Sequence, residues 1–124
     1  MILLLIPLFS MVFTMQTQQA PATHLYDARI ETEKVNGKLL IRNMFENKSQ
    51  NTVDLYYKFK CKREGRSGSS ANSQSGSFTA APGETVTLSK TAVSVAPSDA
   101  YTIDLEVYSN AKTIATDTYS SEEE

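Results

Sequence analysis

The amino-acid sequence predicts an all-β protein, an immunoglobulin-like β-sandwich of about seven antiparallel strands without a disulfide. Three observations lead to this fold class. The 124 residues contain one Cys, so no internal disulfide can form. The chain is rich in Ser and Thr and has no long stretch of helix-forming residues. Short runs that alternate apolar and polar residues are separated by turn signals at intervals of about 8–15 residues, as in a sandwich.

The N-terminal segment predicts an export signal. Residues 2–13 form an apolar run interrupted only by Pro7 and Ser10, and residues 1–22 contain no charged residue. Such a run is shorter than a bilayer span, and the small residues Ala20 and Ala22 fit a signal-peptidase site. We therefore predict a signal peptide over residues 1–22 and an immunoglobulin-like domain over residues 23–124. The domain is expected in the periplasm, without membrane contact, and the alternative is an N-terminal membrane anchor.

The first two strands form a predicted hairpin. Residues 26–34 and 38–47 flank an Asn36-Gly37 pair, and Asn-Gly is a strong hairpin signal because both positions tolerate positive φ. In the second run three apolar residues share a face with Asn43, so its inward face is only moderately clear. The polar residues 47–51 end this strand.

The third strand has the most regular pattern in the chain. Residues 52–64 alternate between an apolar set and a polar set: Val53, Leu55, Tyr57, Phe59 and Cys61 against Asp54, Tyr56, Lys58, Lys60 and Lys62. A period of two over ten residues predicts a half-buried strand. Cys61 falls on its core face, where a small buried hydrophobe is favoured over a reactive thiol.

Residues 65–77 are nearly all small or polar. They are compatible with a flexible loop or with a polar edge strand. We predict a loop that leads into a short strand ending near Ala80, followed by a turn at Pro82-Gly83.

Shorter alternating patterns predict the last three strands. In residues 84–90, Val86 and Leu88 point inward and Thr85, Thr87 and Ser89 outward, and Val93 and Val95 extend the apolar series. After a turn at residues 97–99, the apolar residues Tyr101, Ile103, Leu105 and Val107 alternate with Thr102, Asp104, Glu106 and Tyr108. A turn at Asn110-Ala111 leads into residues 112–119, anchored by Ile114.

The composition argues against catalysis. His24 is the only imidazole and lies next to the predicted mature N-terminus, where a catalytic base is not expected. The sequence contains no phosphate-binding loop, EF-hand loop or multi-cysteine zinc motif. Asp104 and Glu106 read as solvated charges on a sheet face. We therefore predict a protein that is not an enzyme, has no cofactor or metal, and does not bind nucleic acid, since its net charge is −2.

One charged feature stands out. Five basic residues lie between positions 58 and 66 against Glu64 alone: Lys58, Lys60, Lys62, Arg63 and Arg66. The three lysines share one strand face with Tyr56. Such a row can protect a sheet from edge-to-edge aggregation. It can equally attract an acidic or polar extended partner. On the second interpretation, the candidate partner-binding residues are Lys58, Lys60, Lys62 and Arg63, with Tyr56 as a stacking or hydrogen-bonding surface.

Residues 57–107 resemble the curli assembly proteins of the CsgC/CsgH type. The resemblance rests on Gly-Arg-Ser-Gly-Ser-Ser at 65–70, Gln-Ser-Gly-Ser-Phe at 74–78, the Gly-Glu turn at 83–84 and Tyr-Thr-Ile-Asp-Leu-Glu-Val at 101–107. It implies a small immunoglobulin-like domain that keeps the secreted curli subunit from forming amyloid in the periplasm. The implied partner is therefore an amyloidogenic curli-type subunit, bound by a monomer.

The resemblance is incomplete in its cysteines. CsgC-type proteins are associated with a redox-active Cys-x-Cys pair, whereas this chain has Cys61 alone, so a thiol–disulfide activity does not carry over. The leading hypothesis is a periplasmic, chaperone-like inhibitor of curli-subunit assembly that acts through transient electrostatic contacts. One alternative is an immunoglobulin-like accessory or structural subunit of a surface fibre. A redox protein acting through Cys61 is a third possibility.

Overall fold

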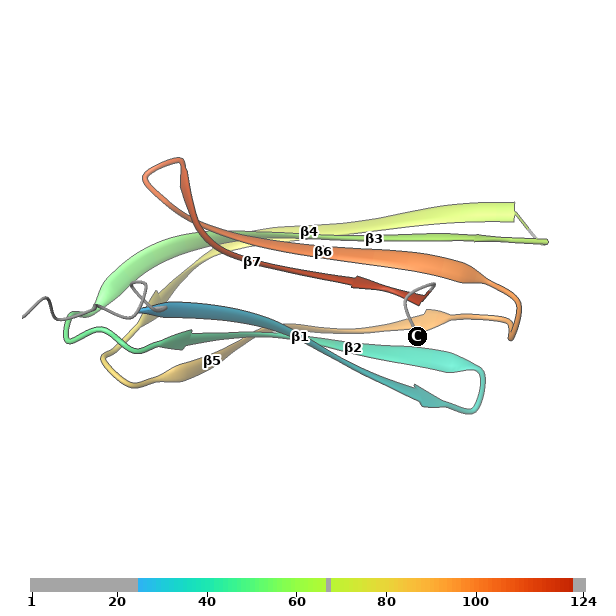
Figure 1. Ribbon diagram of the computed structural model, residues 1–124, viewed down its shortest axis with the longest axis horizontal. Coiled ribbons are helices and arrows are strands. Elements are labelled where there is room, and N and C mark those ends of the chain that lie inside the picture. The colour runs from blue at the N-terminus through green and yellow to red at the C-terminus, as the bar shows by residue number, and fades with distance from the viewer. Residues whose placement is uncertain (1–24, 67, 122–124) are drawn as a thin grey trace, which may run out of the picture.

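The computed structural model describes residues 25–66 and 68–121, and the predicted signal peptide lies outside this range. The described residues form seven strands (Figure 1): β1 (Tyr26–Val35), β2 (Lys38–Asn47), β3 (Val53–Gly65), β4 (Gly68–Ala80), β5 (Thr85–Ser94), β6 (Ala100–Ser109) and β7 (Lys112–Ser120). No helix in this part of the chain is long and apolar enough to cross a membrane. The predicted all-β fold with seven strands is confirmed.

The strands form a two-layer sandwich. One sheet has the order β1-β2-β5 and the other the order β4-β3-β6-β7, with every neighbouring pair antiparallel. The two layers lie one above the other in Figure 1, with β3, β4, β6 and β7 in the upper layer. Four strands therefore stand at sheet edges: β1 and β5 in one sheet, β4 and β7 in the other.

The core lies between the two sheets. Its largest fully buried side chains come from three strands: Leu39, Ile41 and Phe45 on β2, Phe59 on β3, and Ile103, Leu105 and Val107 on β6. These are the central positions of the alternating runs, because a strand with two neighbours is shielded along its inner face. Cys61 is 2% exposed and packs in this core, as predicted. The alternation therefore identified the inner face correctly.

Two hairpin turns have the backbone conformation that two-residue connections require. Asn36 and Gly37 have φ values of 50° and 77°, and Asn110 and Ala111 have φ values of 51° and 67°. Positive φ at both central positions matches the twist of the flanking strands. Both predicted turns are confirmed, although Ala111 occupies a region that its Cβ disfavours.

The prediction of a loop over residues 65–77 is wrong. Gly65 ends β3, and residues 68–77 belong to β4, whose 13 residues pair with β3 in continuous register from Val53↔Ala80 to Gly65↔Gly68. Small polar side chains give a weak local strand signal. A long, regular neighbour supplies the hydrogen-bonding template that the local sequence lacks.

The prediction that Ser89 points outward is also wrong. The β2–β5 register shifts between Asn43 and Met44, so that Asn43 pairs with Ser89 and Met44 with Thr87. Leu88 is the extra residue of this β-bulge, and it reverses the alternation along β5. Ser89 consequently turns inward and its Oγ accepts a 2.8 Å hydrogen bond from Asn43 Nδ2.

Asn47 joins three segments at one end of the sandwich. Its side chain is fully buried, and Nδ2 lies within hydrogen-bonding distance of the carbonyl oxygens of Asn51, Ala80 and Ala81, at 2.7, 3.1 and 3.1 Å. Its Oδ1 accepts from the backbone N and the Oγ of Ser49. Asn47 thereby ties the end of β2 to the following loop and to the end of β4.

Candidate partner-binding surface

The outer face of the four-stranded sheet carries the predicted lysines. Lys58, Lys60 and Lys62 all point away from the core and are exposed, and we call them the basic row. Tyr56 is 39% exposed and lies at the end of this row. These four predicted residues share one face, because alternate residues of β3 face the same side of the sheet.

An acidic row lies beside the basic row. In the β3–β6 register Lys58 is opposite Glu106 and Lys60 is opposite Asp104, whereas Lys62 is opposite Thr102. Such cross-strand pairs contribute about 0.2–1 kcal/mol each. In the described part of the chain no lysine of the basic row forms an ion pair within 4.0 Å. The β6 side of the row is thus partly neutralised by charge.

The β4 side of the basic row has no charge at all. The residues opposite Lys58, Lys60 and Lys62 are Ser75, Ser73 and Ala71. β4 contains no Asp, Glu, Lys or Arg along its whole length. The lysines therefore present an uncompensated positive charge toward β4, and this charge is least neutralised at Lys62.

Two shallow hollows run along this face. Their volumes are about 700 and 750 Å³, and both are lined by Lys58 and Tyr108. The Lys58 Nζ lies 5.4 Å from the centroid of the Tyr108 ring, a cation–π distance. Burial and the neighbouring Glu106 raise the pKa of Tyr108, so its hydroxyl stays protonated at neutral pH. Tyr56 is close to β4, because its hydroxyl lies 3.0 Å from Ser75 Oγ.

Arg63 does not join the basic row. It has the opposite parity on β3, and 17% of its side chain is exposed. Its Nη1 donates to Asp99 Oδ2 at 3.0 Å and its Nε to Ser70 Oγ at 3.2 Å. The backbone N–H of Ala96 and the Arg63 guanidinium lower the pKa of Asp99. Arg63 is thus held in an internal contact that links the β3–β4 hairpin to the loop before β6.

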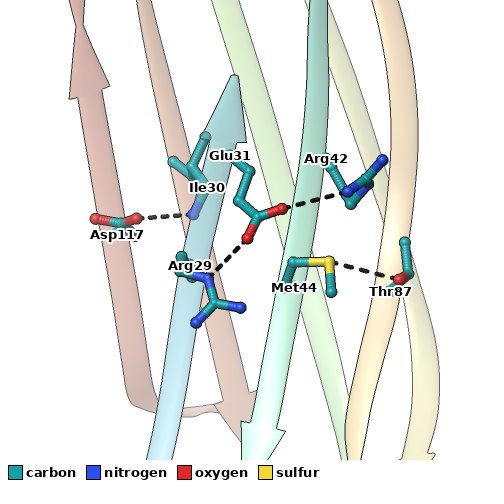
Figure 2. Close-up of polar contacts among 7 residues, drawn as sticks. All are labelled: Arg29, Ile30, Glu31, Arg42, Met44, Thr87 and Asp117. Carbon is teal, nitrogen blue, oxygen red and sulfur yellow. Dashed lines mark hydrogen bonds and ion pairs between the residues drawn. The ribbon is translucent and has the colours of Figure 1, made fainter. Parts of the chain in front are cut away.

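The opposite face of the sandwich carries a cluster of paired charges on β1 and β2. Figure 2 shows Glu31 between Arg29 and Arg42, with N–O distances of 3.1 and 3.4 Å. The Glu31 carboxylate therefore has two cationic partners.

The remaining chemistry is sparse. Burial raises the pKa of the Cys61 thiol, which keeps it protonated and unreactive. No group of three or more His, Cys, Asp or Glu side chains in the described ranges could hold a metal ion.

Sequence reasoning did not find the charge-free strand beside the basic row or the acidic row opposite it. The sequence does contain the information needed to find the charge-free strand, since residues 67–83 contain no charged side chain. The second depends on the β3–β6 register, which aligns residues more than 40 positions apart in sequence.

Comparisons with known proteins show which structures the chain resembles and to which family it belongs. A search of curated protein sequences gave no match. Among solved structures, the curli protein CsgC of E. coli is similar, with a TM-score of 0.65 at 16% identity over 76% of this chain and 97% of that one. The solution structure of CsgH from R. palustris has a TM-score of 0.57 at 21% identity, covering 73% and 89%. A β-glucuronidase of Bacteroides uniformis has a TM-score of 0.56 at 13% identity, covering 77% of this chain and 14% of the enzyme, so the fold also recurs within larger proteins. The model of the CsgH protein family matches residues 27–119, and the chain therefore belongs to the CsgH family.

Proposed function

We propose that the protein is a periplasmic, chaperone-like inhibitor of amyloid assembly by a curli-type subunit. The observation that carries this proposal is membership of the CsgH family over residues 27–119. The similarity to a solved protein described as a curli protein supports the same system. The sparse chemistry of the described residues supports a role in binding, exerted by a monomer after removal of the signal peptide.

The proposed contact surface is the basic row with Tyr56. The three lysines are exposed and form no ion pair within 4.0 Å with residues 25–66 and 68–121, so they are available to acidic groups of an extended chain. Exposed charges steer a partner quickly but hold it weakly, and salt screens them over about 8 Å at physiological ionic strength. Such contacts suit transient engagement of early subunit species. Arg63 contributes to binding indirectly, because its contacts with Asp99 and Ser70 hold the β3–β4 hairpin in position.

The experiment is thioflavin fluorescence kinetics of the curli subunit with substoichiometric amounts of the protein. At low salt we expect the protein to lengthen the lag phase of fibre formation relative to the subunit alone. This lengthening should decrease as the salt concentration increases. A Lys58/Lys60/Lys62→Glu variant should lose the inhibition. The matched control is Lys38/Lys90/Lys112→Glu, which makes the same charge change at three exposed lysines elsewhere.

Two results would contradict the proposal. An unchanged lag at low salt with the parent protein removes the inhibitory function. Equal loss of inhibition in both triple variants shows that net charge, rather than the basic row, is responsible. Stable recovery of the protein within washed fibres would instead identify a fibre subunit.

A further inference from the structure

The four sheet edges of the sandwich differ in how they are protected against pairing with another chain. An exposed edge presents unpaired backbone N–H and C=O groups, and proteins usually blunt it with charges, bulges or cover. Charged residues occur in three of the four edge strands: β1, β5 with Lys90, and β7 with Lys112 and Asp117. β5 also carries the bulge opposite Asn43 and Met44.

The β7 edge is additionally closed by the other sheet. The backbone N of Ile30 in β1 donates to Asp117 Oδ2 at 2.8 Å, and Figure 2 shows this bond running from β1 to β7. β1 and β7 also contact each other. On this side of the sandwich, each edge therefore covers the other.

β4 has none of these protections. It is the longest edge strand, with 13 residues, and contains no charge, no Pro and no register shift against β3. A side-chain hydrogen bond links β4 to β5, from Gln74 Nε2 to Thr91 Oγ1 at 3.0 Å. Residues 68–73 are all exposed. In an antiparallel ladder every second residue directs its backbone groups away from its neighbour, so about half of the residues of β4 direct their backbone N–H and C=O groups away from β3.

We propose that the β4 edge is a strand-addition site that binds one extended, polar segment of the partner subunit, whose only charged residues are acidic and stand at alternate positions. This inference rests on the proposed function and specifies how the partner is held. Backbone hydrogen bonds to β4 would supply the affinity, and side chains at alternate positions would supply the specificity.

The acidic requirement follows from the spacing of the strands. Neighbouring strands lie about 4.8 Å apart, so an added strand would lie about 10 Å from the axis of β3. The outward residues of β4 between them are small, such as Ser73 and Ser75. They leave room for a Glu or Asp on the added strand to meet the extended side chains of Lys58, Lys60 and Lys62. A basic segment would meet the same lysines with the same sign of charge.

The same charges disfavour a second copy of this chain as the occupant. Pairing β4 with β4 of another molecule would place two basic rows on one sheet face, about 14 Å apart at the usual strand spacing. The resulting repulsion has no compensating acid on either β4.

The test is amide hydrogen exchange of isotope-labelled protein, read by NMR, with two synthetic ten-residue peptides. Both consist of Ser, Gln, Asn and Gly, and one carries Glu at alternate central positions where the other carries Lys. With the Glu peptide at ten times its dissociation constant, we expect exchange at every second amide of β4 to slow by about tenfold. The amides of β7 should not change, and the Lys peptide should have no effect.

A pair of proline variants tests independently whether the peptide binds by strand addition to β4. Asn72→Pro and Ser73→Pro occupy adjacent exposed positions, so one of them removes an amide bonded to β3 and the other an amide that points outward. The variant that keeps the thermal stability of the parent should lose binding of the Glu peptide.

The outcomes separate this inference from the proposed function. If the Glu peptide shifts the lysine resonances without alternating protection in β4, the partner binds on the sheet face and the edge site is wrong, while inhibition of fibre formation can stand. Protection of β4 that increases with protein concentration in the absence of peptide would identify a second copy as the occupant and overturn the inference. A parent protein that does not delay fibre formation refutes the proposed function, whatever the peptides do.

Discussion

Two asparagines are fully buried in this sandwich, and we predict that their removal has very different costs. Asn47 satisfies both of its polar atoms, with Nδ2 near three carbonyl oxygens and Oδ1 accepting twice from Ser49. Asn43 donates once to Ser89, and its Oδ1 has no partner among the described residues. Burial alone therefore does not determine the energetic role of these side chains.

The magnitude follows from the groups that each substitution leaves unpaired. Asn47→Ala removes the side-chain partners of the carbonyl of buried Ala80 and of the backbone N–H of Ser49, which is 9% exposed, whereas the Ser49 hydroxyl keeps Asn51 O as an acceptor at 3.1 Å. A buried polar group without a partner costs about 1–3 kcal/mol. We expect Asn47→Ala to lower the free energy of unfolding by about 3 kcal/mol in total.

Asn43→Val serves as the matched comparison. It removes an oxygen that is already unpaired and leaves Ser89 free to rotate its hydroxyl toward solvent, since Ser89 is only partly buried. We expect a change in the free energy of unfolding smaller than about 1 kcal/mol.

Urea unfolding followed by far-UV circular dichroism measures both variants, since the chain has no Trp for fluorescence. For a domain of this size, the loss predicted for Asn47→Ala corresponds to a fall in Tm of about 10–20 °C. The reasoning is refuted if Asn47→Ala costs less than about 1 kcal/mol or if Asn43→Val costs as much as Asn47→Ala.

Four further outcomes follow from individual contacts. Gly65→Ala would place a Cβ into the Asp99 carboxylate and should lower the urea midpoint, with a loss of about 1–3 kcal/mol. Because the pKa of Asp99 is lowered in the fold, the stability it contributes is present above the unfolded value of about 3.9 and is lost as pH falls through the folded value. Asp99→Asn should therefore flatten the acid limb of a stability-against-pH curve, and an unchanged limb would contradict this. Ala111→Gly should raise stability by about 1 kcal/mol in the same urea assay by relieving positive φ, whereas a loss would disprove strain at this turn. The Cys61 thiol should react with a disulfide reagent only at the rate of unfolding, and rapid labelling of the native protein would restore the redox hypothesis.

The positions of the strands were largely predictable because alternation reports a local property. Each residue of β3 or β6 faces either the core or the solvent, and the hydrophobic pattern records this choice directly. The lysines of the basic row and Tyr56 could be assigned to one face for the same reason. Arg63 shows where this reasoning stops, since its internal partner Asp99 lies 36 positions away in sequence.

Two errors came from properties that are not local. β4 lacks an alternating apolar pattern over much of its length, and its strand conformation depends on the continuous ladder with β3. Ser89 points inward because the bulge at Leu88 shifts the β2–β5 register. A register shift depends on how two strands fit against each other, and no single strand encodes it.

The sequence by itself determined the all-β class, the core face of most strands, both hairpin turns and the row of lysines on one face, because each depends on residues a few positions apart. Only the tertiary structure decided what surrounds that row: an acidic row on β6, a long uncharged edge strand on β4, and a sandwich closed on the β1–β7 side. The physical reason is that sheet neighbours are chosen by pairing between distant segments, so the charge and the accessibility of a surface are properties of strand order and register.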